Sequence, residues 1–218
     1  MNKVYLNGKL LNDYTNLKQF KITINGNNNE LILNDFDGSA IVYISIDGDN
    51  SKFSLGHSNI IKNDLSVNFW STADQKVNGS IIEIGNNNFF NGSNIVLISP
   101  INTRLSIGNG NLFAGSINIW ARNDHIIYDL KKSSRINNDK NIYIGDNNWI
   151  GQNVTFLPGG IINNNSVIGW GSLINKNIKK SNVLIAGIPA KIKKNKINWS
   201  RASLMKNVDF ENNLNILN

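Results

Sequence analysis

A histidine, two aspartates and a tyrosine fall within the stretch WARNDHIIYDL at positions 120–130. The histidine, His125, is one of only two in a chain of 218 residues. Histidine suits the role of general base because its unperturbed pKa of about 6.5 lies near neutral pH. The other ring nitrogen then needs an acceptor that fixes the tautomer, and Asp124, Asp129 or a backbone carbonyl could supply it. The stretch therefore indicates either a proton-transfer site or a polar turn.

Positive charge gathers late in the chain. The formal net charge is +7, and a run of about twenty residues holds Lys176, Lys179, Lys180, Lys191, Lys193, Lys194 and Lys196. Such a cluster is either a solvated basic end or a binding site for a polyanion. Nucleic acid is the weakest candidate, because the lysines do not alternate with stacking aromatic residues and no known nucleic-acid motif occurs. We expect no nucleic-acid partner.

A six-residue repeat dominates the later part of the chain. From residue 144 it reads IGDNNW, IGQNVT, FLPGGI, INNNSV, IGWGSL and INKNIK, and the blocks open on Ile144, Ile150, Phe156, Ile162, Ile168 and Ile174. Neither an amphipathic helix nor an alternating strand has this period. A turn-forming residue beside each apolar one is typical of short strands joined by corners. Three strands then close a coil of about 18 residues with the apolar side chains stacked inside. The pattern predicts an all-β, parallel β-helix.

The repeat also defines the organisation of the chain. Upstream, the same step occurs at Ile84, Phe90 and Val96, and again at Ile107, Phe113 and Ile119. One further step reaches His125, where the register breaks, so we expect a loop extruded from the coil near residues 126–141. We expect irregular opening coils over residues 1–80 and regular coils over residues 81–178. Residues 179–218 are expected to form a basic segment with a short C-terminal cap. We expect one domain throughout.

Asparagine makes up roughly a fifth of the chain, often in runs such as NGNNNE and INNNSV. The runs recur between apolar residues at regular spacing. Asparagine tolerates the left-handed backbone conformation better than any residue except glycine. We therefore predict that these runs form the corners between strands.

The composition excludes several kinds of chemistry. The chain has no cysteine, so it can form no disulfide, thiolate metal site or cysteine nucleophile, which fits a reducing compartment. No apolar run approaches the ~20 residues of a membrane span, and the first residues lack the ~7 to 15 residue apolar block of a secretion signal. We expect a cytoplasmic protein with no membrane span and no metal.

Two late segments, NNWIGQNVTFLPGGIINNNSVIGWGSLINK and IAGIPAKIKK, resemble the hexapeptide-repeat acyltransferases. These are trimeric left-handed β-helix enzymes that transfer an acetyl group from acetyl-CoA. The order of FAGSINIWARNDHIIYDL and RINNDKNIYIGDNNWIGQNVT looks most like the branch that O-acetylates bacterial surface polysaccharides, including sialic acid capsules. A gamma carbonic anhydrase would need three zinc-binding histidines, and this chain has two. A sugar nucleotidyltransferase would bring a glycine-rich phosphate loop, which the sequence lacks.

The resemblance implies roles for individual residues. It makes His125 the catalytic base, which would deprotonate the acceptor hydroxyl for direct attack on the thioester. It places Trp149 near the thioester end of CoA; Trp149 fills the sixth position of its block, which we expect to point toward a corner where an indole is unusual. His57 lies outside the motif and is expected to be structural or exposed. The positions matching those that line a CoA groove between subunits are Trp170, Gly171, Asn175, Ala186 and Gly187, with Lys176, Lys191 and Lys194 near the phosphates.

The acceptor side is less determined. Asp124, Tyr128 and Arg135 are candidates there, Arg135 through pairing with a carboxylate of an acidic sugar, although each also fits an ordinary loop. Trp170 stands where the family has a small residue, which alters the shape of the groove. The resemblance implies acetyl-CoA as co-substrate, a homotrimer, and a sugar or polysaccharide acceptor whose identity the residues leave open. Two other functions remain: N-acetylation of an amino sugar or small molecule, and glycan binding without catalysis.

Overall fold

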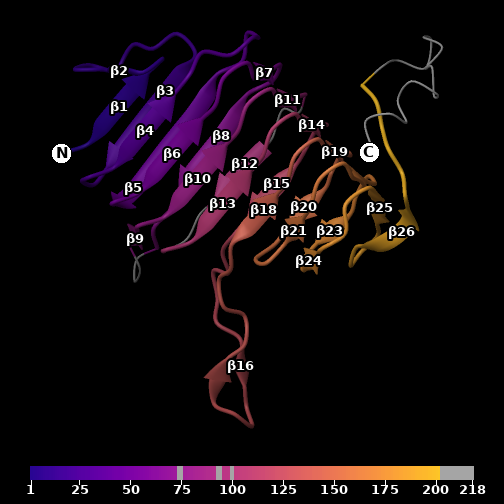
Figure 1. The fold of residues 1–218 in the computed structure, drawn as a ribbon. Coiled ribbons are helices and arrows are strands. Elements are labelled where there is room, and N and C mark those ends of the chain that lie inside the picture. Colours follow the sequence, from indigo (N-terminus) through magenta and orange to yellow (C-terminus); the bar gives the residue numbers. More distant parts are fainter. Residues whose placement is uncertain (73–75, 92–94, 99–100, 202–218) are drawn as a thin grey trace.

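The structure, a computed structural model, describes residues 1–72, 76–91, 95–98 and 101–201. Within these residues every regular element is a strand and none is a helix. The strands stack into a three-sided prism whose sides are largely parallel sheets (Figure 1). Successive strands pass from one side to the next, so each circuit of the prism forms one coil. The predicted all-β, parallel β-helix is confirmed.

Each side of the prism is one sheet of the described chain. Sheet A has nine strands, in the order β2 (Lys9–Leu10), β1 (Lys3–Leu6), β4 (Glu30–Leu33), β6 (Lys52–Leu55), β10 (Ile81–Ile84), β13 (Arg104–Ile107), β18 (Ile142–Ile144), β21 (Ile161–Ile162) and β24 (Asn177–Ile178). Sheet B contains β23 (Leu173–Ile174), β20 (Thr155–Phe156), β15 (Asn118–Trp120), β12 (Ile95–Ile98), β8 (Leu65–Phe69), β5 (Val42–Asp49) and β3 (Phe20–Asn25), with β9 (Val77–Asn78) beside β5. Sheet C contains β26 (Lys191–Asn195), β25 (Val183–Ala186), β22 (Val167–Ile168), β19 (Trp149–Ile150), β14 (Leu112–Phe113), β11 (Phe89–Phe90) and β7 (Ile60–Ile61).

The pairing register gives the length of a coil. Tyr143 pairs with Ile161, and Trp149 pairs with Val167, eighteen residues apart in each case. This spacing agrees with the three strands of six residues that the repeat predicts. At its two ends the prism stops being parallel, because β1 pairs with β2 and β25 with β26 in antiparallel fashion.

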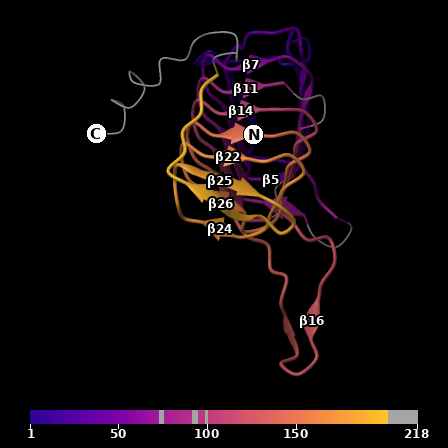
Figure 2. The same ribbon diagram turned by 90° about the vertical axis from the view of Figure 1, so that its right-hand side faces the viewer.

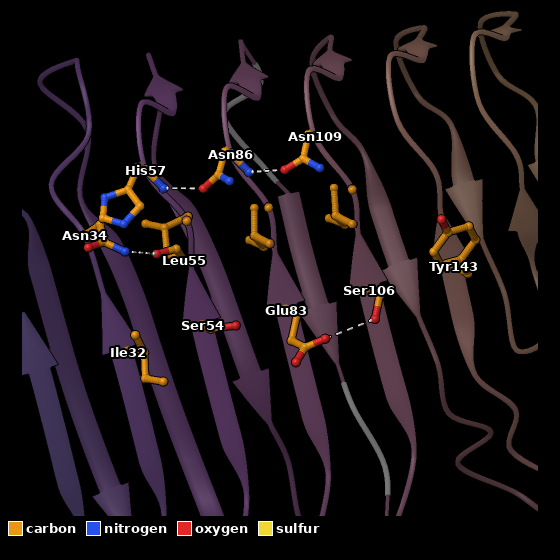
Figure 3. A pocket seen from close by; sticks show the side chains of 15 residues that line it. Ile32, Asn34, Ser54, Leu55, His57, Glu83, Asn86, Ser106, Asn109 and Tyr143 are labelled. Carbon is orange, nitrogen blue, oxygen red and sulfur yellow. Dashed lines mark hydrogen bonds between the residues drawn. The ribbon is translucent and has the colours of Figure 1, made fainter. Parts of the chain in front are cut away.

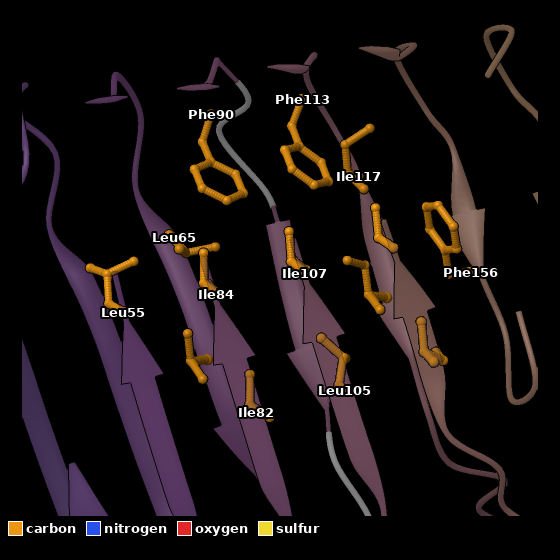
Figure 4. Close-up of a cluster of buried hydrophobic side chains, with 14 of the residues drawn as sticks. Leu55, Leu65, Ile82, Ile84, Phe90, Leu105, Ile107, Phe113, Ile117 and Phe156 are labelled. Carbon is orange, nitrogen blue, oxygen red and sulfur yellow. The ribbon is translucent and has the colours of Figure 1, made fainter. Parts of the chain in front are cut away.

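The interior is filled by the apolar residues that open the repeat blocks. The six predicted from residue 144 onward are all buried, with at most 1% of their surface exposed: Ile144, Ile150, Phe156, Ile162, Ile168 and Ile174. In earlier coils the rings of Phe90 and Phe113 stack with centroids 4.7 Å apart (Figure 4). Burial of one such aliphatic or aromatic side chain contributes about 1.5 to 3 kcal/mol. Each coil buries its interior only against its neighbours, as in other solenoids.

One predicted core position is wrong. The repeat was extended from Phe90 by six residues to Val96, but in β12 it is Leu97 that pairs with the buried Ile119. Val96 pairs with Asn118, which faces outward. Leu97 lies seven residues after Phe90 instead of six, and a shift of one residue moves a strand position to the opposite face.

The asparagine runs form corners between strands, as predicted: residues 26–29 join β3 of sheet B to β4 of sheet A, and the later runs join sheets A and C. Asn87 and Asn147 have positive φ values of 57° and 52°. The asparagine after each of them is fully buried, and its side chain links one coil to the next. The Oδ1 atom of Asn88 accepts the backbone N–H of Asn111 at 2.9 Å, and Oδ1 of Asn111 accepts that of Asn148 at 2.8 Å. This buried asparagine ladder satisfies backbone groups that the tight corner leaves without a strand partner.

Glycine is required beside the ladder because consecutive corners approach closely. A Cβ atom on Gly85 would lie 2.6 Å from Oδ1 of Asn109, and one on Gly108 would lie 2.3 Å from Oδ1 of Asp146. These oxygens accept backbone N–H groups of the preceding corner, as between Asn86 and Asn109 at 2.8 Å (Figure 3). The glycine in the repeat is thus needed because only a residue without a Cβ atom lets consecutive coils stack this closely.

Two segments depart from the coil. Between β15 and β18 the chain forms a hairpin of β16 (Tyr128–Asp129) and β17 (Ser134–Arg135), which projects well beyond the prism (Figure 1). After β26 the chain runs along the outside of sheet C (Figure 2). Of the cap predicted over residues 179–218, residues 202–218 lie outside the described residues.

Candidate active site

His125 lies at the neck of the projecting hairpin and is exposed to solvent. Its backbone carbonyl accepts a hydrogen bond from Nδ2 of Asn137 at 2.7 Å. The side-chain oxygen of Asn137 in turn accepts the backbone N–H of Ile127 at 2.8 Å. One asparagine therefore joins the two strands of the neck and fixes the backbone that carries His125.

The carboxylates near His125 are engaged with other groups. Asp124 forms an ion pair with Nε of Arg122 at 2.9 Å. Asp129 accepts the backbone N–H groups of Lys131 and Lys132 at 2.8 and 3.1 Å and so caps the hairpin turn. Across the described chain, no hydrogen bond joins either carboxylate to the imidazole.

The acceptor-side candidates Tyr128 and Arg135 face each other across the hairpin as a register pair. Tyr128 is 59% exposed. Arg135 forms an ion pair with Asp139 at 3.6 Å, and its Nε atom is buried without a hydrogen-bond partner in the described chain. Asp139 also accepts the backbone N–H of Asn123 at 2.8 Å, so it ties the arginine to the base of the hairpin. The hairpin thus carries an exposed tyrosine, and an arginine with one nitrogen atom still unpaired, a few residues beyond His125.

Trp149 begins β19 and points outward from sheet C with 40% of its surface exposed. In the register it lies between Leu112 and Val167, which occupy the same position in neighbouring coils. The expectation that this position points into a corner is therefore wrong: it is an outward strand position where large apolar side chains recur. The indole N–H of Trp149 donates to no group in the described chain, so it is free to bind a ligand.

The residues expected to border a CoA groove meet at the end of sheet C. A Cβ atom on Gly169 would lie 3.0 Å from Cβ of Ala186, and the backbone N–H of Leu173 donates to the Gly187 carbonyl at 3.0 Å. Ser172 bridges the two segments, because its hydroxyl donates to the Gly169 carbonyl at 2.6 Å and accepts the Gly187 N–H at 3.2 Å. The structure therefore brings the 169–173 turn and the Ala186–Gly187 turn together.

The side chain of Trp170 projects from this turn and is 72% exposed. It covers Gly151 of the preceding coil, since a Cβ atom there would lie 2.5 Å from Cδ1 of Trp170. Gly171 follows with a φ of 65° and open space around it, and Asn175 is exposed at the next corner. A large indole thus projects into solvent beside Gly171, at the position where the resemblance implies a small residue.

The late lysines divide into two groups. A pocket of about 360 Å³ at the last coil brings Lys176 and Lys191 together, and its full lining is Lys176, Asn177, Ile178, Lys179, Lys180, Lys191 and Ile192. Lys179 and Lys180 belong to this site although the resemblance did not single them out. Lys194 does not line the pocket; it pairs with Leu184 on the outer face of sheet C. No acidic side chain lines the pocket, which suits it to bind an anion such as a phosphate.

The other histidine, His57, is exposed at a corner of sheet A, as expected. Its backbone N–H donates to Oδ1 of Asn86 at 2.7 Å (Figure 3). It borders a shallow groove of about 390 Å³ over the outer face of sheet A, near Glu83 and Tyr143. Among the described residues, the lining of this groove includes neither His125 nor Trp149 nor any of the late lysines.

The two halves of the expected site are separate in one chain. His125 follows β15 of sheet B, whereas Trp149 lies in sheet C and the lysine pocket lies between β24 of sheet A and β26 of sheet C. In the residues that the structure describes, no hydrogen bond or ring contact joins His125 to Trp149. The two residues are thus carried by different sides of the prism.

The described residues contain no group of three or more His, Cys, Asp or Glu side chains that could hold a metal ion. They also contain no helix that is long and apolar enough to cross a membrane.

The fold and these turns define a class: parallel β-helices built from hexapeptide repeats. No family model matches the chain. The putative lipopolysaccharide biosynthesis O-acetyl transferase WbbJ of Escherichia coli (strain K12) is 33% identical over 145 residues, which cover 61% of this chain and 73% of that protein. The solved structure of the polySia specific acetyltransferase NeuO superposes with a TM-score of 0.72 at 31% identity, over 85% of this chain and 74% of the other. The chain belongs to the hexapeptide-repeat O-acetyltransferases.

A further relative is the galactoside O-acetyltransferase of Escherichia coli (strain K12), which is 34% identical over 114 residues. This match covers 52% of the chain and 54% of the relative. The chain thus spans about half the length of that enzyme.

Proposed function

We propose that the protein is an acetyl-CoA-dependent O-acetyltransferase that modifies a sugar hydroxyl of a bacterial surface polysaccharide, with sialic acid capsules as the first acceptors to test. The observation that carries this proposal is the 31% identity over 85% of the chain with a polySia specific acetyltransferase. The free indole N–H at Trp149 and the lysine pocket support it, because a thioester carbonyl and a phosphate group are ligands that such groups bind.

In this proposal the acceptor hydroxyl attacks the thioester carbonyl while His125 takes its proton. The tetrahedral intermediate then expels the CoA sulfur, which receives a proton and leaves as the free thiol. The products are an acetyl ester and CoA, so no covalent enzyme intermediate is needed. Trp149 would donate to the acetyl carbonyl or pack beside it, and Lys176 and Lys191 would hold the phosphates.

We further propose that the chain winds left-handed and assembles as a homotrimer in which His125 of one subunit meets Trp149 of its neighbour. The separation of the two residues within one chain supports this arrangement. A ring of three identical subunits repeats one heterologous contact three times, so it would build three equal sites.

Mixed trimers test the shared site. Neither His125→Ala nor Trp149→Ala alone is expected to show more than residual activity. Co-expression of the two should restore about a quarter of wild-type activity, because in a randomly mixed ring that fraction of interfaces combines an intact histidine with an intact tryptophan. The measurement is CoA release by the purified mixture. No gain above the single variants, in particles that light scattering shows to be trimers, would place both residues of each site in one subunit.

The lysine pocket makes a separate prediction. Lys176→Ala and Lys191→Ala should each raise the KM for acetyl-CoA about 3- to 10-fold at low salt, because each removes a charge-assisted contact to a phosphate. The difference from wild type should shrink in about 0.5 M salt, where exposed charges are screened. Lys62→Ala, an exposed lysine in an early coil, is the matched control. Equal KM values for all three variants would show that the phosphates of acetyl-CoA do not bind in this pocket.

The other two functions give different outcomes. The basic experiment incubates the purified protein with acetyl-CoA and candidate glycans and follows free CoA. An O-acetyl product is hydrolysed by mild base, whereas an amide from N-acetylation persists, and mass spectrometry separates the two. A glycan-binding protein without catalysis would release no CoA and show no calorimetric heat with CoA.

A further inference from the structure

Residues 196–201 form a segment, the strap, that lies across the outside of several coils. It leaves β26 and runs along the edge of sheet C past β22 and β14 (Figure 2). At its start, the backbone N–H of Ile197 donates to the Asn182 carbonyl at 2.9 Å. The strap is therefore hydrogen-bonded to the corner of the last coil. From there it runs back toward coils that come earlier in the sequence.

Trp199 lies in the middle of the strap and faces Trp149. The two indole rings have centroids 6.3 Å apart and planes tilted by 40°. The indole N–H of Trp199 donates to the backbone carbonyl of Asn147 at 2.7 Å. Asn147 is the left-handed corner residue two positions before Trp149. Trp199 is thus held by the corner that also sets the direction of Trp149, and one ring has a fixed orientation relative to the other.

Arg201 anchors the far end of the strap. Its Nη2 atom donates to three backbone carbonyls of two earlier corners: Asn87 at 3.2 Å, Gly110 at 2.8 Å and Asn111 at 3.1 Å. Partial burial lowers the pKa of Arg201 below its usual value, yet a guanidinium stays charged at neutral pH. The charge strengthens these three bonds. Together the anchors fix the strap to four corners, with Trp199 between them.

We propose that Trp199 is a positioning residue for the acetyl-CoA site, which orients Trp149 and forms the second aromatic wall beside the thioester. The inference rests on the proposed function for the role of Trp149. Without Trp199, one face of the exposed Trp149 side chain would lose its neighbour, and the indole would sample other rotamers. Ligand binding would then have to order it, which weakens binding. The interaction energy of one pair of aromatic rings corresponds to about a 2- to 10-fold change in a binding constant.

The test compares Trp199→Ala, Trp199→Phe and Arg201→Ala with wild type. Trp199→Ala should raise the KM for acetyl-CoA and its calorimetric Kd about 2- to 10-fold, while the KM for the acceptor stays unchanged. Trp199→Phe keeps a ring but loses the bond to Asn147, so it should recover part of the affinity. Arg201→Ala loosens the strap and should weaken acetyl-CoA binding in the same direction. Trp70→Ala, at a tryptophan 61% exposed in an earlier coil, serves as control.

Two failures are distinguishable. If wild type binds no acetyl-CoA, the proposed function fails, and with it the basis of this inference. If wild type binds acetyl-CoA and Trp199→Ala binds it equally well, Trp199 has no positioning role. A purely structural role would lower Tm without changing the Kd of the folded protein, and it too would overturn the proposal. Should Trp199→Ala fail to fold, Trp199→Phe decides, because unchanged affinity and KM in that variant would contradict the role of the Asn147 bond.

Discussion

Replacement of His125 by alanine should lower kcat for acetyl transfer about 10²- to 10⁴-fold, the contribution of a general base. The KM for acetyl-CoA should change little, since in the proposed mechanism His125 acts on the acceptor hydroxyl while Trp149, Lys176 and Lys191 hold acetyl-CoA. The melting temperature should also stay close to that of wild type. The side chain is exposed, and the neck is held through the His125 carbonyl, which alanine retains. The measurement is CoA release with an acceptor that the wild type acetylates.

The matched control for this variant is His57→Ala. His57 is also exposed, also lies at the end of a coil segment, and uses its backbone N–H for its hydrogen bond to Asn86. Its removal should leave kcat within about 2-fold of wild type, as expected for a surface substitution away from the site. CoA release by His125→Ala at the wild-type rate would exclude the histidine as base, and an equal loss in both variants would point to a general effect of removing imidazoles.

The fold was predictable because its period is carried by single residue types. Each block that opens on an isoleucine or phenylalanine places that side chain inside the prism, as Ile144 and Phe156 show. The asparagine runs mark corners because the left-handed conformation leaves few alternatives at those positions. Val96 was misplaced because Leu97, seven residues after Phe90, takes the register position of Ile119. A period can be read from sequence, whereas the length of an individual corner depends on contacts with the adjacent coils.

The candidate site was less predictable because its contacts join distant parts of the chain. The sequence marks His125 and Trp149 but gives no sign that Trp199 faces Trp149, fifty residues earlier. Arg201 bonds to carbonyls up to 114 residues away, and backbone carbonyls carry no sequence signal. Lys179 and Lys180 were visible as part of the basic run, yet only the closing of the last coil onto β26 places them in one pocket with Lys191.

The buried asparagine ladder should be the most sensitive polar feature of the fold. Asn111→Ala is expected to lower the free energy of unfolding by about 2 to 4 kcal/mol. Its Oδ1 accepts the backbone N–H of Asn148, and its Nδ2 donates to Asn88 at 3.0 Å. All three residues are fully buried, so alanine leaves the N–H of Asn148 without a partner and without water. Urea unfolding followed by circular dichroism measures the difference.

Asn109 provides the control, because it makes the same kind of bond two residues away but in solvent. Its Oδ1 accepts the backbone N–H of Asn86 at 2.8 Å, and its side chain is exposed. Water can replace that acceptor, so Asn109→Ala should cost at most about 1 kcal/mol. Equal losses in the two variants would mean that corner geometry, and not the burial of the ladder, determines the stability of the stack. A larger loss for Asn111→Ala identifies desolvation as the reason that asparagine, rather than any turn-forming residue, fills the buried corner position.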